Sequence, residues 1–326
     1  MKKSILLLVV LSLLSCQPKE QGNPYLTSGE GFASVEGGKV WYGIMGEGDK
    51  APYLYLHGGP GGTGRGGLLY TAVLEDRPVI TMDQLGGGLS TNHQDTSLLK
   101  VENFVEQVKA VRDALGLKEF YLTGHSWGTA LALEYYSAYP EGVKGIAFNS
   151  PYFSTSTWIE DTDALISTLP DSTQRAIKIA EETYAFETDS YLAAMEVFSK
   201  NFLRRSDQPF AKPSYQLINP AYDTMEVKGS SFIYNYMWGP SEFSPTGTLL
   251  KYENIDALKD VKVPVLFTTG EYDEARPSTV KKFQQLVANS QFVEIPNAGH
   301  GTLIDNREVI ISALRDFANR VDSADR

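Results

Sequence analysis

The sequence predicts an α/β fold, in which a mainly parallel β-sheet is flanked by helices and carries an inserted helical cap. Three features of the 326 residues point to this fold. From about residue 31, short apolar runs alternate with segments of helical period, which is typical of parallel strands joined by covering helices. The alternation stops at about residue 155, where helical stretches rich in aromatic residues begin. It returns at about residue 256 and continues to the end of the chain.

The first half of the predicted sheet follows from short apolar runs that are bounded by turn residues. Five such runs predict strands at residues 40–45, 53–56, 78–82, 120–123 and 145–149. Apolar residues at helical spacing predict a helix over 101–115, which ends at Gly116. A second helix is expected over 127–139, where Pro140 closes it.

The middle of the chain lacks a clear parallel strand and predicts the cap. Helical stretches at 172–184 and 191–203 lie among many aromatic residues. After the cap, strands are expected at 264–268 and 291–295 and helices at 278–288 and 309–321. We therefore expect a core formed by residues 31–154 and 256–326, interrupted by a helical cap over 155–255. Two independent domains would leave each half of the sheet incomplete.

Composition restricts the function. Hydrophobic residues make up 42% of the chain and charged residues 21%, as in an ordinary folded protein. The formal net charge is −11, whereas nucleic-acid binding needs a dense basic surface. We therefore expect no nucleic-acid partner.

The N-terminus has the features of an export signal. Lys2 and Lys3 precede an uncharged run over residues 4–15, which is too short for a bilayer-spanning helix of about 20 residues. The run ends at Cys16, the only cysteine of the chain. This order resembles a bacterial lipoprotein signal, which implies that residues 1–16 form a signal peptide ending at a lipid-modified Cys16. The alternative is a free thiol beside an ordinary signal cleavage site.

The residues after Cys16 are polar and contain glycine and proline, so 17–30 are expected to form a tether. Such a protein would be exported and held on a membrane surface by its lipid. Because Gln17 is not the aspartate that tends to retain lipoproteins at the inner membrane, the outer membrane or a periplasm-facing position is expected.

A candidate nucleophile lies in Gly124-His125-Ser126-Trp127-Gly128, which fits the G-x-S-x-G pattern of a nucleophile elbow. It follows an expected strand and opens an expected helix, and this context makes the pattern specific. The sharp turn needs small residues on both sides of the serine. The helix N-terminus beside Ser126 favours a developing anion. The motif predicts an α/β-hydrolase fold with Ser126 as nucleophile; an ordinary helix-capping serine is the alternative.

A serine nucleophile needs a base, and in this fold the order along the chain is serine, acid, histidine. His300 is the only histidine after Ser126, and it lies in a loop of small residues after the last expected strand. Asp273 follows the strand at 264–268 and is the favoured acid. Glu271 and Glu274 are its local competitors.

The anion of an acyl-transfer intermediate needs two hydrogen-bond donors. One is the backbone N–H of the residue after the nucleophile, Trp127. The glycine-rich stretch His57-Gly58-Gly59-Pro60-Gly61 follows the strand at 53–56 and is expected to supply the second, from Gly59. A plain tight turn is the alternative, and the stretch lacks the ending of a phosphate-binding loop. No cofactor or metal is expected.

Three motifs together resemble the proline iminopeptidases and tricorn-interacting aminopeptidases, a family of serine peptidases. They are residues 57–61, Asp83-Gln84-Leu85-Gly86-Gly87-Gly88-Leu89-Ser90 and residues 124–129, in the family's order. The resemblance covers nearly all of the chain after the tether. It implies release of one N-terminal residue, with proline favoured, from short peptides through an acyl-enzyme. We interpret the Asp83 loop as support for the floor of the site.

The resemblance also implies two acidic residues that grip the free amine of the substrate. The cap stretch Trp238-Gly239-Pro240-Ser241-Glu242-Phe243 nominates Glu242, and Glu274 directly follows the expected triad aspartate. Paired carboxylates around an ammonium form strong charge-assisted hydrogen bonds. Expected partners are therefore short peptides or amino-acid amides with a free N-terminus.

Other functions on the same scaffold remain open. An amino-acid amidase or a small-ester hydrolase would use the same triad, and only the amidase would keep the amine-gripping acids. A non-catalytic hydrolase-fold binding protein is a more distant alternative. Epoxide hydrolases and haloalkane dehalogenases carry a carboxylate nucleophile at the elbow, so Ser126 argues against them.

Overall fold

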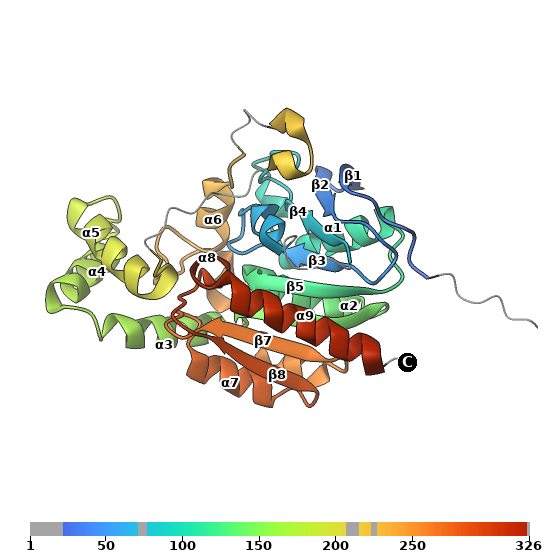
Figure 1. The fold of residues 1–326 in the computed structure, drawn as a ribbon. Helices are drawn as coiled ribbons and strands as arrows, with labels where there is room; N and C mark the ends of the chain where they lie inside the picture. The colour runs from blue at the N-terminus through green and yellow to red at the C-terminus, as the bar shows by residue number, and fades with distance from the viewer. Residues whose placement is uncertain (1–21, 71–76, 207–214, 223–226, 325–326) are drawn as a thin grey trace, which may run out of the picture.

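The strands of the protein form one twisted, mainly parallel sheet (Figure 1). The computed structural model describes residues 22–70, 77–206, 215–222 and 227–324. Within them, the strand order is β1-β2-β4-β3-β5-β6-β7-β8. β2 pairs antiparallel with β1 and β4, and all other neighbours are parallel. The strands are β1 (Gly29–Val35), β2 (Gly38–Met45), β3 (Tyr53–Leu56), β4 (Val79–Met82), β5 (Phe120–Ser126), β6 (Val143–Pro151), β7 (Val265–Gly270) and β8 (Ser290–Ile295).

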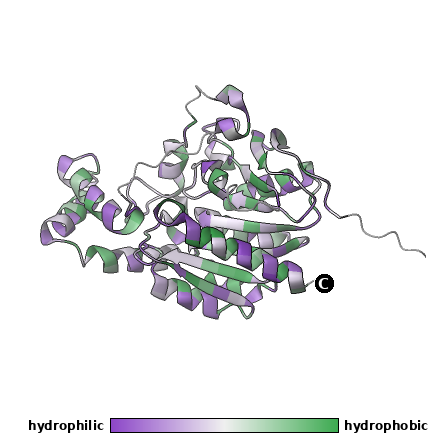
Figure 2. Cartoon of the chain, viewed as in Figure 1, coloured by the Kyte–Doolittle hydropathy of each residue, from purple (hydrophilic) through white to green (hydrophobic). Residues whose placement is uncertain are grey.

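Helices cover both faces of the sheet, as the alternation along the chain predicts. One face packs against α1 (Val101–Ala114), α2 (Trp127–Ala138) and α7 (Pro277–Gln285). The other packs against the 3-10 helix η1 (Gly64–Tyr70) and against α9 (Arg307–Ala324), which crosses in front of the strands in Figure 1. Hydrophobic and hydrophilic residues alternate along α9 in Figure 2, which is the pattern of a helix with one buried side.

Strand β3 shows why the sheet has two hydrophobic cores. Successive side chains of a strand point to opposite faces. Leu54 and Leu56 belong to the core that includes α1 and α2, whereas Tyr53 and Tyr55 belong to the core beneath η1 and α9. All four are buried, which explains why the sequence reads as a continuous apolar run rather than as an alternating one.

The cap is inserted between β6 and β7 and projects from the sheet at the left of Figure 1. Its longer helices are α3 (Thr155–Ile166), α4 (Asp171–Thr183) and α5 (Asp189–Phe198), followed by the π-helical turn η3 (Ser199–Leu203) and by α6 (Ser231–Met237). Ser154, Thr188 and Ser230 each accept a hydrogen bond at the start of α3, α5 and α6. These side-chain caps fix the helix starts. A separate small core around Phe198 and Phe243 joins α4, α5 and η3, whereas Ile233 and Met237 of α6 pack into the main core.

The remaining elements are short. They are η2 (Thr96–Leu98), η4 (Tyr215–Leu217), η5 (Pro220–Tyr222), η6 (Thr248–Lys251), η7 (Ile255–Asp260) and α8 (Thr302–Asp305). The last of these, α8, follows directly after the loop that carries His300.

The prediction of a mainly parallel sheet with flanking helices and an inserted cap is confirmed. The expected tether over 17–30 ends too late. Leu26 already pairs with Gly48, and β1 begins at Gly29. The expected signal peptide, with Cys16, and residues 17–21 lie outside the described residues.

Candidate active site

Ser126 lies at the junction of β5 and α2 in a left-handed backbone conformation, with φ 53° and ψ −124°. Non-glycine residues avoid this region, at a cost of roughly 1 kcal/mol or more. The two flanking glycines make the turn possible. A Cβ on Gly124 would lie 2.3 Å from the carbonyl oxygen of Gly128, and a Cβ on Gly128 would lie 2.1 Å from that of Leu56. The strained strand-to-helix turn expected from the G-x-S-x-G pattern is therefore present.

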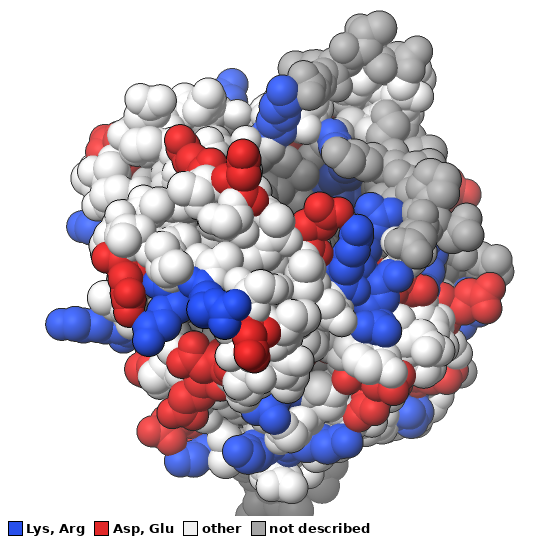
Figure 3. Space-filling model, turned by 90° about the vertical axis from the view of Figure 1, so that its left-hand side faces the viewer, with Lys and Arg blue, Asp and Glu red and all other residues white. Residues whose placement is uncertain are grey.

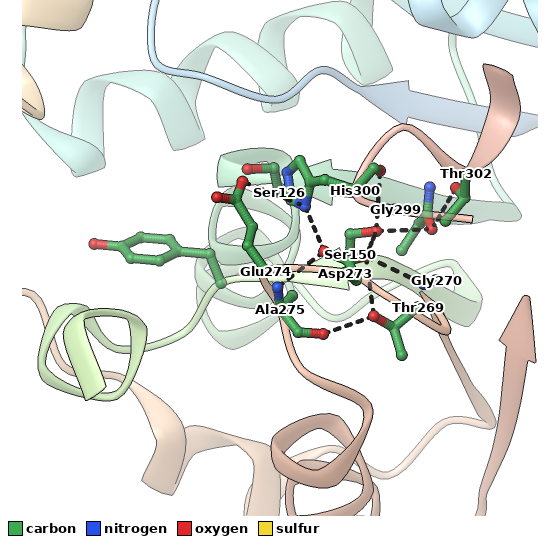
Figure 4. A network of polar contacts seen from close by, with 12 residues as sticks. Ser126, Ser150, Thr269, Gly270, Asp273, Glu274, Ala275, Gly299, His300 and Thr302 are labelled. Carbon is green, nitrogen blue, oxygen red and sulfur yellow. Dashed lines mark hydrogen bonds and ion pairs between the residues drawn. The ribbon is translucent and has the colours of Figure 1, made fainter. Parts of the chain in front are cut away.

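His300 and Asp273 meet across the carboxyl ends of the neighbouring strands β7 and β8. Nδ1 of His300 lies 2.8 Å from Oδ1 of Asp273 (Figure 4). Asp273 is fully buried, and the His300 side chain is 14% exposed. The contact between Nδ1 and the carboxylate leaves the Nε2 edge of the ring for proton transfer, as in a Ser-His-Asp triad.

Asp273 remains a carboxylate despite its burial. Desolvation raises its pKa, but the charge of His300 and hydrogen bonds from His300, Ser150 and the backbone of Ala275 together lower it below the ordinary value. A buried carboxylate that accepts several hydrogen bonds is stabilised in its charged form. The charged form is the one that can orient an imidazole and stabilise the imidazolium that forms during the reaction.

A cavity of about 440 Å³ lies where the cap covers the carboxyl ends of the strands. Its lining includes Ser126 and His300 together with four other candidate site residues, namely Gly59, Trp127, Glu242 and Glu274. Asp273 lies behind His300 and does not line the cavity. Residues separated by up to 241 positions along the chain are thus brought to one space.

The two candidate oxyanion donors flank Ser126. Gly59 has φ +57°, a conformation that suits glycine. The preceding Gly58 packs so closely on the elbow that a Cβ there would lie 3.0 Å from Cβ of Ser126. Trp127 is the first residue of α2, where backbone N–H groups have no partner within the helix. Both residues line the cavity beside Ser126, which is the placement that an oxyanion hole requires.

The loop beneath these donors is held by His57 and Gln84. The backbone N–H of Gln84 donates to Nε2 of His57 at 3.1 Å, and Nε1 of Trp127 donates to Oε1 of Gln84 at 3.1 Å. Burial lowers the pKa of His57 to about 4, so the ring is neutral near pH 7. The three motifs at residues 57–61, 83–90 and 124–128 are therefore joined by direct contacts.

Asp83 supports this arrangement and does not line the cavity. Its carboxylate accepts hydrogen bonds from the backbone N–H of Gly64 at 2.6 Å, the backbone N–H of Leu89 at 2.7 Å and the hydroxyl of Tyr215 at 2.7 Å. Burial raises its pKa to about 6. These contacts fix the loops on the floor of the site and leave Asp83 without a role in the chemistry.

Glu242 and Glu274 both face the cavity, one from the cap and one from the core. The hydroxyl of Tyr234 donates to Oε2 of Glu242 at 2.6 Å. Oε1 of Glu274 lies 3.7 Å from Nδ1 of His300, while its buried Oε2 has no hydrogen-bond partner within the described residues. Burial raises the pKa of both carboxyls, and the negative charges of Glu242 and Asp273 raise that of Glu274 further. Two buried carboxylates that lie close together are energetically unfavourable unless a cation binds between them.

Aromatic side chains form much of the remaining wall. The ring of Trp158 lies edge-on to that of His300, with centroids 5.6 Å apart, and Tyr152 packs edge-on against Trp238 at 5.5 Å. Together with Tyr234 these residues line the cavity. Apart from hydroxyl groups, the rings of His57, His125 and His300 and the two glutamates, the lining is apolar, and it suits a compact apolar side chain.

The competing acids take other positions. Glu271 is exposed and accepts a hydrogen bond from the backbone N–H of Asn297 at 2.9 Å, on the outside of the loop. Glu274 is farther from His300 than Asp273 is. Among the acidic side chains weighed from the sequence, Asp273 is the one placed to orient His300.

Sequence reasoning missed Ser150 and Asn149. Ser150 donates a hydrogen bond to Oδ2 of Asp273 at 2.6 Å, and Oδ1 of Asn149 accepts one from Thr302, just after His300, at 3.1 Å. The sequence feature that could have identified them is their position at the carboxyl end of an expected parallel strand, where the ligand sites of α/β folds lie. Tyr234 was missed as well, although its hydroxyl bonds the carboxylate of Glu242.

Within the described ranges, no cluster of three metal-ligating side chains is found, and no helix is long and apolar enough to cross a membrane. Figure 3 views the cap side of the molecule, where acidic and basic side chains are interspersed.

Comparisons with known proteins match nearly the whole chain. The family model of the alpha/beta hydrolase fold matches residues 52–307. A proline iminopeptidase of Heyndrickxia coagulans is 37% identical over 297 residues, covering 90% of this chain and 99% of that protein.

Two crystal structures are also similar over nearly their full lengths. VinJ has a TM-score of 0.80 and 27% identity, over 90% of this chain and 99% of its own. A proline iminopeptidase of Mycobacterium smegmatis has a TM-score of 0.79 and 28% identity, over 91% and 100%. The predicted fold is therefore confirmed.

Proposed function

This chain belongs to the proline iminopeptidase family of α/β-hydrolases, and we propose that it is a serine aminopeptidase that releases the N-terminal residue of short peptides, with proline favoured. The family assignment rests on relatives that it matches over 90% of its length. The specific reaction is supported by one observation above the others. A single cavity holds the serine elbow, the histidine base and two glutamates whose carboxyl groups burial leaves poorly solvated.

In the proposed reaction Ser126 attacks the carbonyl carbon of the first residue while His300 accepts its proton. Asp273 holds His300 in the tautomer with a proton on Nδ1 and stabilises the imidazolium. The backbone N–H groups of Gly59 and Trp127 stabilise the oxyanion. His300 then returns the proton to the leaving amine, and an acyl-enzyme on Ser126 remains. Water activated by His300 releases the residue and restores the serine.

Glu242 and Glu274 are proposed to bind the free α-amine of the substrate. Before binding, Glu274 has an unpartnered buried oxygen and a pKa well above the ordinary value. An ammonium group would supply up to three N–H donors and a positive charge to this pair. An endopeptidase or a simple esterase binds no terminal amine and would not need these two glutamates.

The first residue of the substrate is proposed to pack against Tyr152, Trp158 and Trp238. These rings present apolar faces and edges next to Ser126 and are themselves held by mutual edge-on contacts. The rigid pyrrolidine ring of proline loses little conformational entropy when it is confined there. Alanine is smaller and phenylalanine bulkier, so turnover is expected to fall for both.

A panel of aminoacyl naphthylamides that carry proline, alanine or phenylalanine tests the proposal. Rapid cleavage of the prolyl compound and slower cleavage of the other two are expected. An amino-acid amidase is the second candidate, because it would keep the same two glutamates. It would hydrolyse prolinamide but not a prolyl peptide, so release of proline from a short peptide, measured by chromatography, separates the two activities.

We further propose that the protein is exported and anchored to a membrane by lipid on Cys16, because its N-terminal residues have the order of a lipoprotein signal. The geometry suits this arrangement. The side chain of Asn23 bonds the backbone of Lys118 and Glu119, directly before β5, whereas Ser126 ends β5. A tether would thus leave from the end of the sheet opposite the cavity.

Cell fractionation of Cys16→Ser tests the anchor. The variant is expected in a soluble fraction or as unprocessed precursor, whereas Ser126→Ala, which keeps the cysteine, is expected to stay with the membrane. Membrane association of Cys16→Ser equal to that of the wild type would contradict the proposal.

A further inference from the structure

The pairing of β5 with β6 is irregular at the end of β6. His125 of β5 pairs with Asn149 of β6, but the next residue, Ser126, pairs with Pro151. Ser150 is therefore an extra residue in β6, and it has φ +50°, in the left-handed region. A bulge of this kind redirects a side chain, and strain at a non-glycine residue is typical of functional sites.

The bulge turns the Ser150 side chain toward the acid of the proposed triad. Ser150 is fully buried, and its hydroxyl lies 2.6 Å from Oδ2 of Asp273. The other acceptors near this hydroxyl, the His300 carbonyl and Oδ1 of Asn149, are 3.3 and 3.4 Å away. The single hydroxyl proton is thus directed to Asp273 (Figure 4).

The two oxygens of Asp273 have different partners. Oδ1 faces Nδ1 of His300 and the backbone N–H of Ala275. Oδ2 faces Ser150, the hydroxyl of Thr269 at 3.0 Å and the backbone N–H of Gly270 at 3.2 Å. The Thr269 hydroxyl also lies 2.7 Å from the Ala275 carbonyl, which competes for its proton. Ser150 is therefore the short side-chain donor that holds Oδ2.

We propose that Ser150 is a positioning residue for the hydrolytic reaction, whose hydroxyl holds Oδ2 of Asp273 so that Oδ1 remains directed at His300. Ser150 does not line the cavity, so it acts through Asp273 rather than on the substrate. This inference rests on the proposed serine-hydrolase mechanism but not on the peptide substrate. It explains why a serine occupies a position whose backbone conformation suits glycine.

Ser150→Gly is the informative variant, because glycine accepts the backbone conformation and removes only the side chain. Its melting temperature is expected to stay within a few degrees of the wild type, because relief of the left-handed backbone strain at residue 150 offsets part of the lost hydrogen bond. Its kcat is expected to fall roughly 10- to 150-fold, the effect of losing one hydrogen bond to a charged group, while KM changes less than about twofold. Ser137→Ala, which removes a hydroxyl bonded to the Leu133 carbonyl in α2, is the control and should leave kcat unchanged.

Two substrates keep this test separate from that of the peptide substrate. The fall in kcat should be equal for prolyl-naphthylamide and p-nitrophenyl acetate, because the triad serves both. If only the ester is hydrolysed, the aminopeptidase proposal fails, while the role of Ser150 is still measured on the ester. A wild-type kcat in Ser150→Gly would overturn the inference.

The rate of Ser126 labelling by a fluorescent phosphonate tests the route through Asp273. In an Asp273→Asn background the carboxylate is gone, so adding Ser150→Gly should slow labelling by less than about twofold. The same slowing in both backgrounds would show that Ser150 acts independently of Asp273 and would overturn the inference.

Discussion

The backbone N–H of His300 donates a hydrogen bond to the carbonyl oxygen of Phe202 at 2.8 Å, so the loop that carries the base is bonded to the cap. The next residue, Gly301, donates to the carbonyl of Leu203 at 2.7 Å. Both acceptors lie in the π-helical turn η3, a type of turn that is frequent at functional sites. The cap therefore does more than cover the cavity, because it also fixes the position of His300.

Gly299→Ala is expected to disrupt this contact. A Cβ on Gly299 would lie 2.5 Å from the carbonyl oxygen of Phe202, so the loop or the cap must move. We expect a loss of about 1–3 kcal/mol in the free energy of unfolding and at least a tenfold lower kcat. Chemical unfolding and kinetics measure the two effects. Gly29→Ala, where a Cβ meets no atom within 4 Å, is the control; equal behaviour of the two variants would contradict the expectation.

Replacement of the nucleophile should abolish turnover without unfolding the protein. Ser126→Ala removes the hydroxyl and little volume, so its melting temperature should match that of the wild type within a few degrees. His300→Ala should be comparably inactive, and the double variant no worse than either, because the members of a triad act as a unit. Kinetics on prolyl-naphthylamide measure this. Residual activity of Ser126→Ala above a few per cent would show that another nucleophile operates.

The buried His57 should make the protein less stable in acid. Its pKa is lowered from 6.5 to about 4, so the unfolded chain takes up a proton over that range while the folded protein does not. Stability is therefore lost as the pH falls from 6.5 to 4, by up to roughly 3 kcal/mol from this residue.

The free energy of unfolding in urea, measured at about pH 7 and at about pH 4.5, checks the prediction. The comparison protein is His57→Gln, whose residue 57 does not titrate. The wild type should lose more stability than the variant between the two conditions. Asp83, whose pKa burial raises to about 6, acts in the opposite direction, but it does so in both proteins. An identical loss in the two would contradict the assignment of a buried neutral ring.

Glu242→Gln should separate amine recognition from chemistry. Loss of one hydrogen bond to a charged group, worth roughly 1.5–3 kcal/mol, should lower kcat/KM for prolyl-naphthylamide about 10- to 150-fold. Hydrolysis of p-nitrophenyl acetate, which has no amine, should be spared. Steady-state kinetics on both substrates provide the contrast, since general damage to the cap would reduce both rates equally.

Much of the fold follows from local pattern. The strand at residues 53–56 and the helix starting at Val101 lie where the sequence predicts them, because buried parallel strands and amphipathic helices leave clear signals. Strand β1 was missed: its sequence, GEGFASV, begins with two glycines around a glutamate and resembles a loop. Its place is fixed by pairing with β2, a tertiary contact that no local pattern reports.

The candidate site also contains residues that the sequence indicates and residues that it does not. Ser126, Asp273 and His300 could be nominated from the sequence because each stands at or after the end of an expected strand, in the order that the fold requires. Ser150 was not found, because its importance depends on a one-residue bulge in β6 that points it at a residue 123 positions away. The bond between His300 and Phe202 is equally invisible, since backbone groups carry no sequence signal.

The most direct test of the account compares kcat/KM of the wild-type enzyme for prolyl-p-nitroanilide and N-acetyl-prolyl-p-nitroanilide. Acetylation removes the positive charge and adds bulk, while Glu242 and Glu274 stay without a cationic partner. If Glu242 and Glu274 bind the amine, the loss should exceed the roughly 10- to 150-fold expected for one hydrogen bond to a charged group, so that the acetylated compound is cleaved barely above background. Comparable cleavage of the two compounds would contradict amine recognition and would favour an esterase or an endopeptidase on the same scaffold.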